Sequence, residues 1–181
     1  ATFKESDIIR FHPIITQGGS MVNAIPESTR LESYLRGANF EAIRKANRSV
    51  NRALCGAALS LGTNIEIIDF PGYAPLVDDM NVRQVAIDAA AQFIPHQEFS
   101  VFGHMGSGST DMGDLSCVMP VAHSYCGGAT GKAHGNNYQI ADPIAACVDN
   151  AKWQLGMVRL MLENDAQRAK KTIADFKPKF A

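Results

Sequence analysis

The sequence predicts an α+β fold in two parts, with a boundary near residue 76. Three observations support this prediction. Residues 8–15 alternate apolar and polar side chains, which is typical of a strand with one covered face. Residues 39–61 repeat apolar side chains at steps of three and four, as an amphipathic helix does. Beyond residue 77, helical patterns are separated by glycine-rich stretches.

The first part begins with a predicted antiparallel pair of strands over 8–15 and 29–36. Pro13 cannot donate a ladder hydrogen bond, so the first strand is expected at a sheet edge. The alternation places His12 and Arg36 together on the polar face. The residues expected on the covered face are Ile9, Phe11, Ile15, Leu31 and Leu35.

A helix over 39–61 follows, with Asn39 as its N-cap and Gly62 as the residue that ends it. The next apolar run, NIEIIDF at 64–70, is predicted to be a third strand. A helix packed on one face of such a sheet is an α+β layer, and we expect it to occupy residues 1–76.

The second part, residues 77–181, begins with a helix capped by Asp78 or Asp79 and ended by Pro95. Residues 103–116 are rich in Gly and Ser and are predicted to be a loop. Asp142 and Pro143 form an N-cap and N1 pair for a long helix. Its apolar stripe consists of Ile144, Val148, Ala151, Leu155, Val158 and Leu162, and a shorter helix is expected near 165–176.

Composition excludes several classes of protein. The chain has 181 residues, of which 46% are hydrophobic, and a net charge of -1, so it is not intrinsically disordered. Balanced charge gives no electrostatic footprint for nucleic acid, and no apolar run is long enough to predict a membrane span. The four cysteines have no C-x-x-C spacing, which favours reduced thiols and a cytoplasmic location.

His134 is the best-placed histidine for chemistry, since it lies in a glycine-bounded loop where an imidazole could bind a metal ion. A zinc centre needs three or four ligands, however. The other candidates, Asp111, Asp114 and His123, have no recognisable ligand spacing. His12 and His96 are expected at the surface, and His104 and His123 border glycine-rich loops.

Several segments together resemble the M20 family of metal-dependent peptidases and amidohydrolases. The stretch IIRFHPIITQGGSMVNAIPESTRLESYLRG and the helix and apolar run after it are similar to the lid, or dimerisation, domain of that family. The stretch GSGSTDMGDLSCVMPVAHSY, the loop ending in KAHG and the last long helix resemble the end of its catalytic domain. The nearest branch is the aminobenzoyl-glutamate hydrolase and N-acyl-amino-acid amidohydrolase group.

The resemblance implies a partial ferredoxin-like lid at 1–76 and the C-terminal part of an α/β metallopeptidase catalytic domain at 77–181. The activity it implies is metal-dependent hydrolysis of an amide bond in N-acyl amino acids or small dipeptides, with Zn²⁺ or Mn²⁺ in a two-metal site. It further implies a substrate with a free carboxylate and a homodimer formed through the lid. Most metal ligands of the family precede the matching region, so we expect this chain alone to be inactive.

Three lid residues of this family have counterparts here. His12 resembles the lid histidine that reaches the active site of the partner subunit, where a histidine donor can stabilise an oxyanion. Asn23 and Arg36 resemble the residues that hold the substrate carboxylate, and Arg grips a carboxylate with two N–H donors.

In the second part, His134 resembles the last metal ligand of the family, and imidazole suits Zn²⁺ and Mn²⁺. Ser109, Thr110 and Asp111 resemble its substrate-side loop. A second interpretation of the sequence is a non-catalytic dimerisation or binding module that retains the lid without the metal chemistry.

Overall fold

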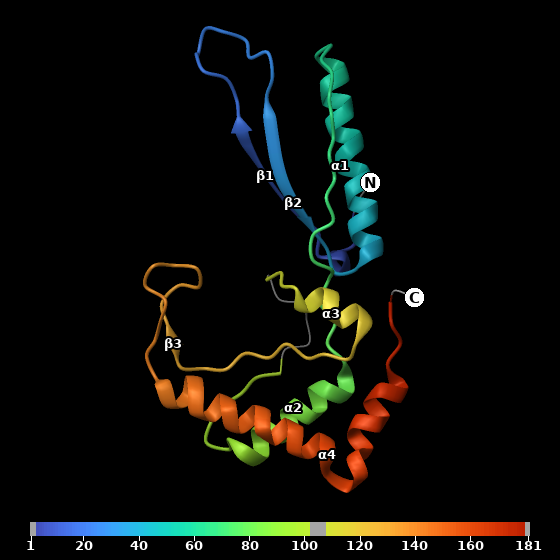
Figure 1. Cartoon of the computed structure of the whole chain (residues 1–181). Helices are drawn as coiled ribbons and strands as arrows, with labels where there is room; N and C mark the ends of the chain where they lie inside the picture. Colours follow the sequence, from blue (N-terminus) through green and yellow to red (C-terminus); the bar gives the residue numbers. More distant parts are fainter. Residues whose placement is uncertain (1–2, 102–107, 180–181) are drawn as a thin grey trace. The chain divides into compact units, whose positions relative to one another are not determined.

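A computed structural model describes residues 3–101 and 108–179 of the chain. It divides into two compact units, Ala1–Pro75 and Leu76–Ala181, next to the boundary expected from the sequence. The described residues contain helices and two small antiparallel sheets, so the α+β class is confirmed. Figure 1 identifies the elements of each unit.

The sheet of the first unit is a hairpin of β1 (Arg10–Gln17) and β2 (Arg30–Arg36). The strands are antiparallel, with His12 opposite Tyr34 and Arg10 opposite Arg36. Opposed residues share a face and side chains alternate along each strand. The prediction that His12 and Arg36 lie on the same face is therefore confirmed.

The opposite, apolar face of this hairpin is covered only at one end. Phe11 and Leu35 are half-buried next to the start of the following helix, whereas Ile15 and Leu31 are 72% and 45% exposed. The prediction that this whole face is buried is therefore wrong for the distal end of the hairpin. No described element packs over that end, so its side chains stay in contact with solvent.

Helix α1 (Phe40–Ser60) begins and ends where the sequence predicts. The Asn39 Oδ1 atom accepts a hydrogen bond from the Ala42 amide at 2.9 Å, and Gly62 adopts a φ of 67° just after the helix. Ala42 and Ala46 are buried, since their small side chains allow the helix to approach the rest of the unit closely.

The third strand predicted over 64–70 is wrong, because this segment pairs with no strand in the described structure. It runs back along α1 instead (Figure 1). The Asp69 Oδ2 atom accepts hydrogen bonds from Asn47 Nδ2 at 2.7 Å and Asn51 Nδ2 at 2.9 Å. Side-chain amides of α1 thus hold an apolar segment that has the composition of a strand but no ladder partner.

The second unit is organised by α2 (Met80–Phe93) and α4 (Asn150–Asp175), which pack against each other. Asp79 caps α2, accepting from the amides of Asn81 and Val82, which confirms one of the two predicted caps. A Cβ atom on Gly156 would overlap the Phe93 ring, so glycine is what permits this close approach. The core between the helices contains Val85, Ala89 and Leu160, with Phe93, Trp153, Met157 and Met161 at its edge.

The predicted loop over 103–116 is partly wrong. Residues 102–107 lie outside the described residues, but Met112–Val118 form α3. Gly113, Ser116 and Cys117 are buried, and Ser116 Oγ donates to the Gly113 carbonyl at 2.7 Å. Burial of these small residues overrides their low helix propensity.

The second unit also contains a short hairpin and a π-helix. Strands β3 (Ala129–Thr130) and β4 (Gln139–Ile140) pair antiparallel. The π-helix Ile144–Asp149 leads directly into α4, and Asp142 caps it as predicted by accepting from the amides of Ile144 and Ala145. Non-helical φ and ψ angles at Glu163–Ala166 kink α4, so that its last turns form a separate helical segment.

Helix α4 and the π-helix before it carry apolar side chains on two sides. One side packs on α2, while the stripe expected from the sequence faces solvent. Its exposed members are Ile144, Val148, Leu155, Val158 and Leu162, at 59%, 42%, 70%, 55% and 62%. A helix that is apolar all round is normally buried on every side. A large apolar face of the second unit is therefore left uncovered.

Two further features bear on the environment of the chain. All four cysteines are free, with Cys117 buried and Cys55, Cys126 and Cys147 exposed. Across residues 3–101 and 108–179, no helix combines the length and the apolar run that membrane crossing requires.

The helix contact at Gly156 leads to a prediction with a matched control. Replacing Gly156 with Ala forces the new methyl group into Phe93 and should destabilise the second unit by about 1–2 kcal/mol. Replacing Gly56 of α1 with Ala meets no atom within 4 Å and should stabilise the first unit by about 0.5–1 kcal/mol. Trp153, the single tryptophan, reports urea unfolding of the second unit, and helical circular dichroism reports on both. Stabilisation by both substitutions would contradict the described α2–α4 contact.

Candidate functional site

The polar face of the β1–β2 hairpin brings two of the expected site residues together. His12 is exposed and lies opposite Tyr34, which is 70% exposed. The Arg36 guanidinium lies 5.9 Å from the centre of the Tyr34 ring, so the ring supports it from one side. Diagonal neighbours on one sheet face are about 7–8 Å apart. This face therefore presents an imidazole and a guanidinium within reach of one small ligand.

Asn23 does not join this group. It lies in the exposed loop between β1 and β2, at the end of β2 opposite Arg36 (Figure 1). The six steps from Arg30 to Arg36 span about 20 Å of extended chain. A small ligand bound at Arg36 therefore cannot also contact Asn23 of the same chain.

In the second unit, Ser109, Thr110 and Asp111 lie just before α3. Thr110 Oγ1 donates to Asp111 Oδ1 at 2.9 Å and accepts from the Met112 amide at 3.4 Å. Asp111 occupies the N-cap position of α3, but its side chain caps no amide there. Ser109 and Asp111 are exposed, and Thr110 is half-buried.

His134 is exposed in the loop between β3 and β4, with a φ of 63°. Residues other than glycine adopt this left-handed conformation infrequently, and it is often found at functional sites. The amide of Gly135 donates to the Lys132 carbonyl at 2.7 Å, which closes the turn. The loop thereby holds the His134 backbone in a fixed turn and leaves its ring accessible.

The metal interpretation fails one test of fit. Within the described ranges, no group of three or more His, Cys, Asp and Glu residues could hold a metal ion. His134 belongs to no such group there, and His104 lies outside the described residues. The residues described do not by themselves form a Zn²⁺ or Mn²⁺ site.

A buried carboxylate that sequence reasoning missed lies at the end of the π-helix. Asp149 is 2% exposed, and its Oδ2 atom contacts His96 Nε2 and accepts from Gln97 Nε2, both at 2.8 Å. Lys152 Nζ lies 3.4 Å from Oδ1. Hydrogen bonds from His96 and then Gln97 hold the pKa of Asp149 below its ordinary value. His96 is exposed, as the sequence predicts, and only the fold reveals its buried partner.

His123 is the other histidine whose environment the sequence does not indicate. Its backbone amide donates to Asp78 Oδ1 at 3.2 Å, and its ring centre lies 5.1 Å from that of Tyr125. The Nδ1 atom is buried and has no hydrogen-bond partner among the described residues. Within the described residues, His123 is therefore a loop histidine whose ring is not fully hydrogen-bonded.

No protein-family model, curated protein sequence or solved structure matches the chain. The geometry of the units groups His12 with Arg36 in the first unit, and Ser109 with Thr110 and Asp111 in the second.

The Asp149 contacts predict how stability depends on pH. Because its pKa is lower in the folded than in the unfolded chain, Asp149 stabilises the fold above its unfolded pKa near 3.9. That stabilisation is lost as the pH falls through the folded pKa. Replacing His96 with Asn should raise the folded pKa of Asp149 toward its unfolded value, so that acidification removes less stability and the loss is complete at a higher pH. The Asp149 carboxyl carbon signal in NMR measures this pKa, and Trp153 fluorescence measures unfolding.

His134→Asn is the matched control, since His134 is exposed in the β3–β4 loop and is not among the residues that contact the Asp149 carboxylate in the described structure. It should leave the Asp149 titration unchanged. Equal titrations in the wild-type and His96→Asn chains would show that His96 does not hold this carboxylate.

Proposed function

We propose that this chain is part of a metal-dependent amidohydrolase or peptidase of the M20 type, acting on N-acyl amino acids or small dipeptides. In this proposal the first unit is a partial lid of ferredoxin-like type, and the second is the C-terminal part of the catalytic domain. The observation that supports it most is the shared face of His12 and Arg36 on the β1–β2 hairpin. A carboxylate clamp and a hydrogen-bond donor at this spacing suit an N-acyl amino acid.

Each residue of that face has a separate role. The guanidinium of Arg36 binds the substrate carboxylate through paired N–H donors. The imidazole of His12 donates a hydrogen bond to the scissile carbonyl oxygen, where negative charge develops during attack by water. Exposure of His12 suits a residue that acts on the active site of a second copy in a homodimer.

Other residues have roles that need further protein surface. His134 would be one ligand of a Zn²⁺ or Mn²⁺ ion that activates water, with the remaining ligands supplied from outside the described residues. Ser109, Thr110 and Asp111 would border the substrate, and Asn23 would contact it from another subunit. The free thiols suit the cytoplasmic location expected from the sequence.

A second candidate is a non-catalytic dimerisation or binding module. The uncovered apolar side of α4 suits a chain that associates with further polypeptide, which both candidates require. Two properties distinguish the candidates. The enzyme has a carboxylate site on the hairpin and shows metal-dependent turnover in the assembled protein, whereas the module shows no turnover.

The proposed carboxylate clamp predicts a loss of ligand binding. Replacing Arg36 with Gln should weaken binding of an N-acetyl amino acid by about tenfold, since a charge-assisted hydrogen bond is lost. Arg30→Gln is the matched control, because Arg30 lies on the same face of β2 about 20 Å away. NMR titration of the chain measures both. The carboxamide of the same ligand should bind equally weakly to all three proteins, and an equal effect of both substitutions would contradict the clamp.

The ligand count predicts the behaviour of the chain alone. Water activation needs a metal ion held by about three protein ligands and a nearby base. Purified residues 1–181 with excess Zn²⁺ or Mn²⁺ should therefore not hydrolyse a panel of N-acyl amino acids and dipeptides. Chelator-sensitive turnover by a preparation free of longer protein would mean that the chain holds a complete site.

A further inference from the structure

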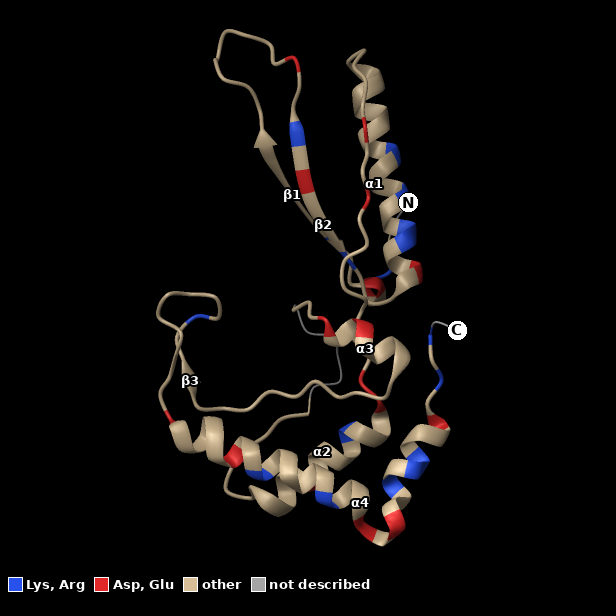
Figure 2. Cartoon of the chain, in the orientation of Figure 1, with Lys and Arg blue, Asp and Glu red and all other residues tan. Residues whose placement is uncertain are grey.

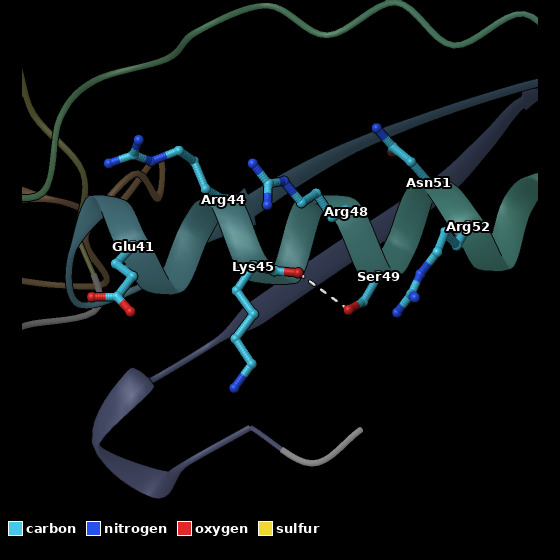
Figure 3. Close-up of a pocket in the computed structure, with 7 residues that line it drawn as sticks. All are labelled: Glu41, Arg44, Lys45, Arg48, Ser49, Asn51 and Arg52. Carbon is cyan, nitrogen blue, oxygen red and sulfur yellow. Dashed lines mark hydrogen bonds between the residues drawn. The ribbon is translucent and has the colours of Figure 1, made fainter.

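The outward face of α1 carries an unusual row of positive charge. Arg44, Arg48 and Arg52 recur every four residues, and Lys45 lies beside them. All four are exposed, and Figure 2 shows the basic residues along this helix. Three residues at this spacing form a line with steps of about 6 Å. Figure 3 shows a shallow pocket lined only by side chains of α1, which is a concavity between long side chains on the surface.

Glu41 lies at the N-terminal end of this row and lines the same pocket, but no carboxylate of the described residues forms an ion pair with the row. Within residues 3–101 and 108–179, no ion pair is formed by any of the three arginines, Arg44, Arg48 and Arg52. Arg44 Nε donates only to the Phe40 carbonyl, at 3.4 Å, and Lys45 lies 6.0 Å from the Phe3 ring centre. Asp69, which is held against the same helix, is bonded to Asn47 and Asn51.

This arrangement destabilises the helix that carries it. Like charges four residues apart on a helix repel each other and lower its stability. Arg44 and Lys45 also lie in the N-terminal part of α1, close to the positive end of the helix dipole. Between Arg44 and Arg52 the helix contains no acidic residue that would relieve this repulsion, so the row suits an anionic partner.

We propose that this face of α1 docks an acidic helix of a partner protein. The continuation of the face supports a helical partner, because Cys55, Gly56 and Leu59 follow the basic row. No heavy atom lies within 4 Å of a Cβ built on Gly56, and Leu59 is 82% exposed. A partner helix with Glu or Asp at every fourth position, followed by a large apolar residue, complements both the basic row and the apolar end of this face.

Other occupants fit this face less well. A phosphate backbone would not use the apolar end at Leu59, and a net charge of -1 gives the chain no long-range attraction for polyanions. A symmetric contact between α1 of two copies would place basic rows against each other. The docking is therefore distinct from the proposed homodimer and does not depend on the proposed catalytic function.

Fluorescence anisotropy with two labelled peptides tests the proposal on the full chain. One peptide is helical with Glu at positions i, i+4 and i+8 followed by Leu, and the other has the same composition in permuted order. At low ionic strength, the ordered peptide should bind about fivefold more tightly than the permuted one. Equal binding of the two peptides would overturn the proposal, since the face would then attract negative charge without recognising a helix.

Substitutions locate the binding to α1. A triple variant that neutralises the three arginines should weaken binding of the ordered peptide about tenfold. Because the substitutions remove repulsion between like charges, the helix content and the melting temperature of this variant should stay at or above those of the wild type. A control variant with the same change in charge on α4 should bind as the wild type does. The triple variant carries Arg44→Gln, Arg48→Gln and Arg52→Gln, and the control carries Arg159→Gln, Lys170→Gln and Lys171→Gln.

Three results would contradict the proposal. Undiminished peptide binding by the triple variant would place the site elsewhere. Tighter binding of a DNA duplex, or of vesicles with anionic lipid, that depends on the same arginines would assign the face to a polyanion. If the triple variant folds poorly, the single variant Arg48→Gln, at the centre of the row, replaces it in the test. Unchanged peptide binding by Arg48→Gln would also contradict the proposal.

Discussion

The pairing register of β1 with β2 is the constraint on which the functional interpretation depends. Side chains alternate with a period of two residues, so a slip by one residue would move Arg36 to the face opposite His12. A two-stranded hairpin has little stability of its own in water. The hairpin is packed only near the start of α1, where Phe11 and Leu35 are half-buried, and this end also positions Arg36. The same contact thus holds the sheet and its polar site.

Uncovered apolar surface is the second property that unites the two units. In the first, the distal hairpin and the 64–70 segment expose large apolar side chains, among them Ile15 and Phe70. In the second, α4 packs on α2 through Gly156 and Leu160 but leaves its other apolar side exposed. Both units therefore have surfaces that association with further polypeptide would stabilise. The proposed enzyme and the alternative binding module share this requirement.

Local signals in the sequence predicted local structure well. Asn39, Asp79, Asp142 and Gly62 mark helix ends because caps depend on a few neighbouring backbone groups. The β1–β2 pair and its polar face followed from alternation. The 64–70 segment failed because apolar composition does not provide a ladder partner, and α3 was missed because burial of Gly113 and Cys117 is a tertiary effect.

The candidate site was predictable only where it depends on one hairpin. His12 and Arg36 could be placed together from alternation alone, whereas the separation of Asn23 from Arg36 follows from the length of β2. The contact of His96 with Asp149 joins residues 53 positions apart, and no pattern in the sequence indicates it. The basic row on α1 is visible in the sequence, but only the structure shows that no acidic residue in the described part of the chain pairs with its arginines.

The central claim is that one hairpin register presents His12 and Arg36 on the same face. Cross-strand backbone NOEs measured on the isotope-labelled chain test it most directly. The account predicts NOEs that join His12 to Tyr34 and Arg10 to Arg36. Hα–Hα or amide–amide NOEs that instead join His12 directly to Ser33 or to Leu35 would place the two side chains on opposite faces and contradict the account.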